Sequence, residues 1–374
     1  MVVYDVVVAG AGLWGCTIAR VLAEANFRVL VLEERKNLGG NCRTEEIDGI
    51  EVHTYGSHIF HTHLPEVWRF VNRFADFNGY QHKVLACHEG KTYFLPLGLA
   101  LINSFYGRNL RPYEVEDFIR QESAGCQEPR NFEEQAISFI GKPLYDAFIR
   151  NYTMKQWGTD PRNLDAAIIK RLPVRASYDI NYFPDLWQGI PTSGYNALFK
   201  ALIDHPLIEL RCGVDYLSER VSLPRSIPTF YSGPIDRFFG FKFGALPWRS
   251  LRFERENLDV ADFQGSSVVN YVDADVSYTR VHEFKHFHPE RKDVMALPKT
   301  IVCREYPQTW RQGDEPYYPV NNPESAALLA RYQEDAAKIP NLVIGGRLGE
   351  YKYYDMDQSI GRALEVAKTW LGGR

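Results

Sequence analysis

Several features that mark membrane, secreted and metal-binding proteins are missing from this sequence. No stretch approaches the about 20 apolar residues that a membrane-spanning helix needs. The first residues, MVVYDVVVAGAG, carry no basic segment and no signal-peptide cleavage site, so we expect a cytoplasmic protein. No two cysteines have CxxC or zinc-like spacing, which predicts free thiols and no metal site at Cys16, Cys42, Cys87, Cys126, Cys212 and Cys303.

Charge of one sign, repeats and low-complexity segments are also missing. Lysine and arginine number 43 against 47 aspartates and glutamates, a net charge of −4, and no basic run suggests nucleic-acid binding. The 374 residues suffice for one large domain or a few smaller ones. Aromatic side chains are frequent, at 14%. They could stack on flat ligands and bind phosphates, but a large buried core also uses them.

A βαβ unit with a glycine-rich turn opens the chain. The letters YDVVVA predict a buried strand, GAGLWG a turn into a helix, and RVLVL a second strand that ends at Glu33. Gly10 allows the tight turn, Gly12 the approach of a pyrophosphate, and Gly15 close packing of helix and strand. The helix N-terminus would bind the diphosphate and Glu33 the ribose hydroxyls. This order predicts a dinucleotide site, because a glycine turn in an unrelated α/β domain leaves Glu33 unexplained.

A second pair of glycines decides between the dinucleotides. Leu38-Gly39-Gly40-Asn41 follows the acidic strand end closely. This arrangement resembles the flavoproteins that include amine oxidases and protoporphyrinogen oxidases, and it lets the chain pass close to the FAD diphosphate and ribityl chain. FAD is therefore favoured over NAD.

Hydrophobic periodicity predicts an α/β fold, with an FAD-binding Rossmann-like domain, a helical insertion and an antiparallel β-sheet domain. The expected FAD-binding domain is discontinuous, over residues 1–80, 193–240 and 316–374. Between its parts we expect a mainly helical, substrate-side insertion (81–175), a strand or crossover (176–192) and the antiparallel sheet (241–315). A cleft between domains is the expected place for a substrate.

Six further segments are distinctive in composition and order. They are NYTMKQWG (151–158), IKRLPVR (169–175), NYF (181–183), YTR (278–280) with Glu283 and His286, DEPYYP (314–319) and GRLGEYKYYDMD (346–357). Together they resemble the bacterial UDP-galactopyranose mutases over essentially the whole chain. The resemblance implies an isomerase that interconverts UDP-galactopyranose and UDP-galactofuranose. The reaction is redox-neutral overall yet requires reduced FAD.

The family mechanism uses the cofactor as a nucleophile. Reduced flavin N5 attacks the anomeric carbon and displaces UDP, so that a covalent sugar–flavin adduct forms. The sugar opens and recloses through another hydroxyl before UDP returns. The resemblance further implies a homodimer, an external reductant and a place in cell-wall or surface polysaccharide biosynthesis.

The resemblance also assigns roles to individual residues. Its catalytic residues are the phosphate-binding Arg171 and Arg280, with His61 close to the reactive face of the flavin. The substrate contacts are Phe148, Thr153, Trp157 (on a mobile loop), Arg171, Tyr182, Asn270, Arg280, Tyr318, Tyr353 and His82. The cofactor contacts are Gly10, Gly12, Leu13, Trp14, Gly15, Glu33, Glu34, Gly40, Asn41, His58, Ile59, Asp215, Arg347, Tyr354, Asp355, Met356, Asp357 and Gln358.

Some of these residues allow other interpretations. His58 and His61 stand three apart, as metal ligands can, but no third ligand is identifiable and a role beside the flavin is favoured. Glu283 and Asp355 could carry protons, although the mechanism does not demand it. His82 stands where many bacterial members have asparagine. A relative that handles an N-acetylated sugar has arginine in place of His61, so the histidine favours plain galactose.

Three rival functions share parts of the pattern. An amine-oxidase-like FAD oxidoreductase would need an apolar substrate cage, against which Arg171, Arg280 and the tyrosines argue. A binding module like the GDP-dissociation inhibitors would lack the third glycine, which is present as Gly15. A mutase acting on UDP-N-acetylgalactosamine or UDP-arabinopyranose differs only in its substrate.

Overall fold

A computed structural model of the protein describes residues 4–123, 129–171, 174–224 and 226–373. The chain forms two compact units, and the first of them contains both ends of the chain. This first unit comprises Met1–Gly79, Asp185–Trp248 and Pro316–Arg374, and the second comprises Tyr80–Pro184 and Arg249–Glu315. In the described part of the chain, no helix is both long enough and apolar enough to cross a membrane. Five cysteines are free, and Cys126 lies outside the described residues.

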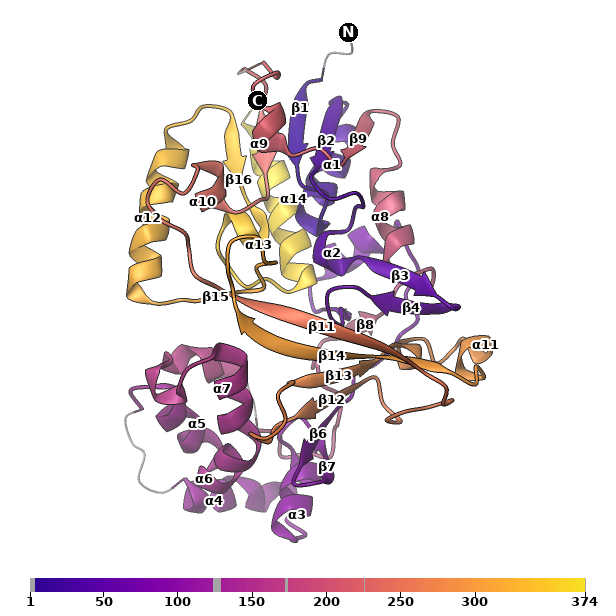
Figure 1. The fold of residues 1–374 in the computed structure, drawn as a ribbon, viewed down its shortest axis with the longest axis vertical. Helices are drawn as coiled ribbons and strands as arrows, with labels where there is room; N and C mark the ends of the chain where they lie inside the picture. The colour runs from indigo at the N-terminus through magenta and orange to yellow at the C-terminus, as the bar shows by residue number, and fades with distance from the viewer. Residues whose placement is uncertain (1–3, 124–128, 172–173, 225, 374) are drawn as a thin grey trace. The chain divides into compact units, whose positions relative to one another are not determined.

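A five-stranded parallel sheet is the centre of the first unit (Figure 1). Every residue of its strands β1 and β2 is buried, as expected for apolar strands covered on both faces. The order is β16 (Leu342–Ile344), β10 (Thr229–Tyr231), β1 (Val6–Ala9), β2 (Val29–Glu33) and β9 (Ile208–Cys212). The βαβ unit predicted from the sequence is therefore present, and two later segments of the chain extend its sheet.

Helices from distant parts of the chain pack around this sheet. The helix of the βαβ unit, α1 (Leu13–Glu24), packs against α8 (Tyr195–Ile203) and against α14 (Met356–Gly372). The yellow α14 lies beside the indigo α1 in Figure 1. The other elements of the unit are η1 (Gly40–Cys42), β3 (Thr44–Ile47), β4 (Ile50–His53), β5 (Phe60–Thr62), α2 (Pro65–Val71), β8 (Trp187–Gly189), α9 (Tyr216–Glu219), α10 (Ile235–Phe238), β15 (Tyr318–Pro319), α12 (Pro323–Ala337) and α13 (Gly346–Gly349).

The second unit is built on a largely antiparallel sheet. Six strands follow one another in the order β11 (Trp248–Leu258), β14 (Thr300–Thr309), β13 (Arg280–Glu283), β12 (Val268–Tyr271), β6 (Val84–His88) and β7 (Lys91–Leu95). Only the pairing of β12 with β6 is parallel among these neighbours. The sequence did not predict β6 and β7 within the mainly helical segment. Their turn has positive φ at Glu89 and Gly90, which suits a two-residue hairpin, but Glu-Gly is a weaker signal than Asn-Gly or Asp-Gly.

The helical part of the second unit shares a hydrophobic core with this hairpin. Tyr93 of β7 packs in one cluster with Phe132, Tyr145 and Phe148 from the helices. The helices are α3 (Leu99–Tyr106), α4 (Pro112–Glu122), α5 (Phe132–Ile140), α6 (Lys142–Leu144), η2 (Tyr145–Arg150), α7 (Asn151–Trp157), η3 (Pro161–Asn163), η4 (Ala166–Arg171), η5 (Phe284–Phe287) and α11 (Lys292–Met295). The predicted fold class, with its Rossmann-like part, helical segment and antiparallel sheet, is confirmed.

Candidate functional site

The glycines between β1 and α1 stand where side chains do not fit. Gly10 has φ +102°, and a Cβ there would lie 2.2 Å from Ser232 Oγ. A Cβ on Gly15 would lie 1.9 Å from the carbonyl oxygen of Gly10, so helix and turn pack without room for a methyl group. The backbones of Gly12 and Gly40 also approach closely, because a Cβ on Gly40 would lie 3.2 Å from Gly12 Cα. The glycine-rich turn and the second pair of glycines thus meet, backbone to backbone, at Gly12 and Gly40.

The N-terminus of α1 opens at this surface. Among the described residues, no side chain caps the helix at Gly12, and its first turn holds no acidic residue. Its first N–H groups are therefore without a side-chain acceptor, at the end of the helix that favours negative charge. Leu13 and Trp14, both buried, form this first turn. The Trp14 ring packs against the backbone of Gly345, and its Nε1 is buried without a hydrogen-bond partner in the described structure.

Glu33 lies where the sequence predicts a ribose-binding carboxylate, at the end of β2. Its side chain accepts hydrogen bonds from the backbone nitrogens of Ala11 at 2.6 Å and Arg35 at 2.8 Å. Burial raises the pKa of Glu33, although both N–H donors act against this. The Arg35 guanidinium donates to Asn41 Oδ1 at 3.0 Å and lies 4.7 Å from the centre of the Tyr55 ring. Arg35, two residues after Glu33, thus contacts both Asn41 and Tyr55, and neither contact was predicted from the sequence.

A second arginine joins two of the predicted cofactor residues. Arg237 donates to Glu34 at 2.5 Å and to Asp215 Oδ2 at 3.0 Å. Asp215 also caps α9 through the backbone nitrogen of Leu217. The resemblance assigns both acids to the cofactor but does not name the cation that links them, because Arg237 stands in no recognisable motif.

The predicted flavin-side histidines belong to β5 and the turn before it. His61 Nδ1 lies 2.7 Å from Asp185 Oδ2, and both side chains are largely buried. A carboxylate at Nδ1 orients the ring and favours the tautomer with its proton on that nitrogen. His58 Nδ1 instead lies 2.8 Å from the carbonyl oxygen of Gly56, and Ile59 is buried. The rings of His58 and His61 thus have separate partners, and Asp185 is a positioning group that the sequence analysis missed.

The C-terminal cofactor segment leads into α14. Arg347 donates to the Tyr317 carbonyl at 2.6 Å. Burial, together with the hydrogen bond that the Tyr354 hydroxyl donates to Glu350, raises the pKa of Tyr354. Asp355 and Gln358 form a capping box at the start of α14, on either side of Met356 and Asp357.

The buried Asp357 ties this helix to the histidine strand. Its Oδ2 accepts from Thr62 Oγ1 of β5 at 3.0 Å. One hydrogen bond thereby holds together the histidine strand and the start of α14, across 295 positions of the chain.

Two predicted phosphate-binding tyrosines lie together in the first unit. The rings of Tyr318 and Tyr353 stack, with centroids 5.6 Å apart and an interplanar angle of 20°. The pair comes from two of the family-like segments, β15 and the residues just before α14.

In the second unit, Asn270 of β12 and Arg280 of β13 are directly opposite each other, and Arg280 is opposite Glu305 of β14. Directly opposite residues of an antiparallel pair share one face of the sheet. Arg280 Nε donates to the Tyr152 hydroxyl at 2.9 Å, and its Nη1 lies 3.7 Å from Glu305 Oε2. Asn270 Oδ1 is buried and has no hydrogen-bond partner among the described residues.

The Glu305 side chain is almost completely buried. The sequence did not single out this residue. Burial raises its pKa, but the charges of Arg280 and His282 outweigh this and leave the pKa of Glu305 below its ordinary value. An ionised Glu305 balances and orients Arg280 from inside the sheet. An acid at an inward position of the strand KTIVCREYP is the signal that could have found it.

α7 carries two further predicted substrate residues. Thr153 is buried, and Trp157 is the last residue of the helix, before Gly158 at φ +66°. Arg249 fixes this helix end, because its Nε donates to the Gln156 carbonyl at 2.9 Å.

The remaining predicted substrate residues lie in different surroundings. The rings of His82 and Phe183 stack with their centroids 5.7 Å apart. The backbone carbonyl of His82 accepts a hydrogen bond from the Tyr182 nitrogen at 2.8 Å. Phe148 packs in the hydrophobic core, and its ring centroid lies 5.4 Å from that of His88. Arg171 is the last residue of η4, and its side chain lies outside the described structure.

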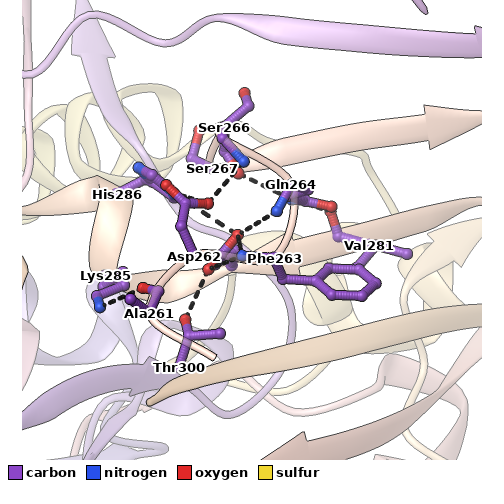
Figure 2. A network of polar contacts seen from close by, with 12 residues as sticks. Ala261, Asp262, Phe263, Gln264, Ser266, Ser267, Val281, Lys285, His286 and Thr300 are labelled. Atoms are coloured by element: carbon purple, nitrogen blue, oxygen red, sulfur yellow. Dashed lines mark hydrogen bonds and ion pairs between the residues drawn. The ribbon is translucent and has the colours of Figure 1, made fainter. Parts of the chain in front are cut away.

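One group in the described chain has the composition of a metal site. Asp262, Glu283 and His286 can each offer one ligand atom, and these atoms lie within 4.8 Å of one another. The Glu283 carboxylate, however, already accepts from Thr300 Oγ1 at 2.7 Å and from the backbone nitrogen of Gln264 at 2.9 Å. Figure 2 shows this network closing the loop around residues 261–266. Its bonds stabilise the loop and already use the Glu283 carboxylate.

The residues of the first unit fit FAD. A bare glycine backbone, an uncapped helix N-terminus and a buried carboxylate at the strand end suit a diphosphate and its ribose. The second unit offers an anchored cation beside a buried amide oxygen without a partner. Such a pair can bind an anionic group and a hydroxyl donor.

Comparisons with known proteins agree with these features. A family model described as UDP-galactopyranose mutase matches residues 147–353, and one described as NAD(P)-binding Rossmann-like domain matches residues 8–74. The dTDP-fucopyranose mutase of Escherichia coli is 40% identical over 98% of both chains. The UDP-galactopyranose mutase of Mycoplasma pneumoniae is 34% identical over 98% of this chain and 96% of its own. A crystal structure of reduced UDP-galactopyranose mutase matches all of this chain and 95% of its own, with a TM-score of 0.77 at 14% identity.

Proposed function

Because the chain belongs to the UDP-galactopyranose mutase family, we propose that it interconverts UDP-galactopyranose and UDP-galactofuranose. The predictions of an isomerase and of FAD as its cofactor are confirmed at the level of the family, whose relatives span 98% of this chain. The amine-oxidase-like alternative is set aside by the same membership. The observation that carries the proposal is the anchored Arg280 beside the unpaired, buried oxygen of Asn270.

The first unit would hold the cofactor. The N-terminus of α1 and the bare backbone of Gly12 and Gly40 suit its diphosphate, and Glu33 suits a ribose. When bound in its reduced form, FAD supplies the electron pair that displaces the nucleoside diphosphate from the anomeric carbon. His61, oriented by Asp185, would present a fixed imidazole to the flavin.

The chain's own contribution to the reaction is position and charge. Arg280 would bind the diphosphate both before and after it leaves, since a guanidinium never deprotonates and offers a planar set of donors. Tyr152 and Glu305 would hold that guanidinium in one orientation. Asn270 Oδ1 would accept a hydrogen bond from a substrate hydroxyl, and Tyr318 with Tyr353 would donate hydrogen bonds to phosphate oxygens. The proposed substrate set is completed by Arg171, Phe148, Thr153, Trp157, Tyr182 and His82.

The decisive experiment is an anaerobic assay. Dithionite-reduced protein is incubated with UDP-galactofuranose, products are separated by chromatography, and oxidised protein is the control. Formation of UDP-galactopyranose only by the reduced protein is expected. Absence of conversion by fully reduced, flavin-loaded protein would overturn the proposed substrate.

A second substrate has a specific observation in its favour. The Escherichia coli relative at 40% identity is a dTDP-fucopyranose mutase. A dTDP-fucose substrate lacks the hydroxyl at C6 of the sugar and carries thymine on a deoxyribose, so it presents the same diphosphate to Arg280. The same assay with dTDP-fucofuranose compares the two, and the larger kcat/KM identifies the substrate. UDP-N-acetylgalactosamine is tested in the same series.

The proposal also includes the setting of the enzyme. It acts as a homodimer in the cytoplasm, takes electrons for its flavin from an external reductant, and supplies furanose sugars for cell-wall or surface polysaccharides. These statements rest on the resemblance of the sequence. Size-exclusion chromatography with light scattering tests the dimer directly.

A further inference from the structure

The Lys155 side chain of α7 points into a ring of backbone carbonyls. Its Nζ donates to the carbonyl oxygens of Tyr271 at 2.7 Å, Asp273 at 2.9 Å, Val276 at 2.9 Å and Tyr278 at 3.1 Å. An ammonium group has three N–H donors, so four acceptors occupy all of them, and two of the acceptors share one donor. The whole segment from residue 271 to 278 is therefore closed around one positive charge.

This segment connects two of the proposed substrate residues. It begins one residue after Asn270 and ends two residues before Arg280, which face each other across β12 and β13. On the other side of the contact, α7 carries Thr153 and Trp157, two residues to either side of Lys155. The Lys155 ammonium thus connects α7 to the turn that links Asn270 and Arg280.

A neutral side chain could not make this connection. Backbone carbonyls that converge on one point repel one another, and a buried carbonyl without a donor is costly. Two acids near the cage, Asp273 and Asp275, favour the charged ammonium. Asp273 is itself held in place by His88 Nδ1 at 2.6 Å and by the backbone nitrogen of Glu89 at 2.8 Å.

The helix itself has a separate attachment. The guanidinium of Arg249 donates to the carbonyls of Gln156 at 2.9 Å and Lys155 at 3.4 Å, so the end of α7 is fixed from β11. Gly158 allows this contact, because a Cβ there would lie 2.8 Å from Arg249 Nη1. Loss of the Lys155 ammonium would therefore release the turn between Asn270 and Arg280 and leave the helix attached.

We propose that Lys155 is a positioning residue for the mutase reaction, whose ammonium holds the 271–278 turn so that Asn270 and Arg280 meet the nucleotide sugar. The inference rests on the proposed function, since it takes Arg280 as the residue that binds the diphosphate. The Lys155 ammonium is already bonded to four protein carbonyls, so it acts through these two residues.

The first test replaces the ammonium by a methyl-capped chain of similar length. Lys155→Met is expected to raise KM for the nucleotide sugar, and the dissociation constant of UDP, by about tenfold or more. FAD content is expected to stay at the wild-type level. The control is Lys142→Met, which removes an exposed lysine of the same unit whose partner is Asp146 and is expected to leave both constants unchanged. Unchanged KM and UDP affinity in Lys155→Met would overturn the inference.

A second test supplies the missing charge from solution. Lys155→Ala leaves the carbonyl cage open, and added n-propylammonium is expected to restore part of the UDP affinity. The neutral 1-propanol, of nearly the same size, is the control and is expected to restore none. Equal effects of both additives would show that the cage needs volume rather than charge, and would overturn the inference.

The pH dependence of the wild-type enzyme decides the matter even where the variants do not fold. Burial lowers the pKa of Lys155 to about 8, against the attraction of the two acids. The ammonium is therefore present below pH 8 and lost above it, so KM is expected to rise between about pH 7.5 and 9.5. A flat profile contradicts the inference. Conversion of no nucleotide sugar by the wild-type enzyme at any pH would count against the proposed function instead, so the two failures are distinguishable.

Discussion

The hydroxyl of Tyr152 accepts a hydrogen bond from Arg280 Nε at 2.9 Å. Tyr152 lies at the start of α7, and Arg280 is the first residue of β13, 128 positions later in the chain. Burial raises the pKa of Tyr152 to about 12, so this hydroxyl stays protonated while it accepts from the guanidinium. The contact fixes the plane of Arg280, and the consequences for activity can be measured.

Arg280→Ala is expected to lower kcat/KM by about 100-fold or more, because it removes the cation proposed to bind the diphosphate. The cofactor residues of the first unit are untouched, so the flavin spectrum and FAD content should match the wild type. Steady-state kinetics on the reduced enzyme, with flavin quantified after denaturation, measure both. Loss of the flavin from the variant would refute the assigned role.

Tyr152→Phe removes only the hydroxyl that orients Arg280. A hydrogen bond between a neutral and a charged group contributes about 1.5–3 kcal/mol, so we expect KM to rise by roughly 10- to 100-fold. The effect should be absent in Arg280→Ala, where the partner is already missing, and a double-mutant cycle detects this. Additive effects of the two substitutions would mean that Tyr152 acts by another route.

The cofactor side of the fold was predictable because its signals are local. Gly10, Gly12 and Gly15 stand at fixed distances in the chain, and strand, turn and helix each have a sequence pattern of their own. The hairpin of β6 and β7 was not predicted, because its Glu-Gly turn is a weak signal and the neighbouring helices set the expectation for the segment.

The groups that hold the predicted site residues in place could not be predicted from the sequence. Asp185 lies 124 positions from His61, and Glu305 lies on the strand after Arg280, so no local spacing connects either pair. The family resemblance pointed to Arg280 and His61, but it did not indicate which acidic residues hold them in place. The carbonyl cage of Lys155 is less visible still, because its ligands are backbone atoms that any residue provides.

Gly12→Val is expected to abolish retention of FAD. The valine side chain would occupy the surface between the start of α1 and Gly40, where the backbones approach closely. Absorbance near the flavin maxima after gel filtration measures the bound cofactor. The matched control is Gly361→Ala in α14, where a Cβ would meet Val67 at an ordinary 3.5 Å, and this protein should stay yellow. A fully yellow Gly12→Val protein contradicts the assignment of the site.

The loop network around Glu283 predicts a pH dependence of stability. Burial lowers the pKa of His286, but Glu283 and Asp262 outweigh it, so that the pKa of His286 lies above its ordinary value. A raised pKa in the folded state means that the protonated ring stabilises the fold below its ordinary pKa of about 6.5, and that this contribution is lost as the pH rises through the folded-state value. His286→Gln, which cannot be protonated, should therefore lower the free energy of unfolding more at pH 6 than at pH 8.5. Urea unfolding of both proteins at the two pH values measures the difference. An equal loss at both would show that His286 stabilises the loop as a neutral ring, and the ion pair with Glu283 would then contribute nothing.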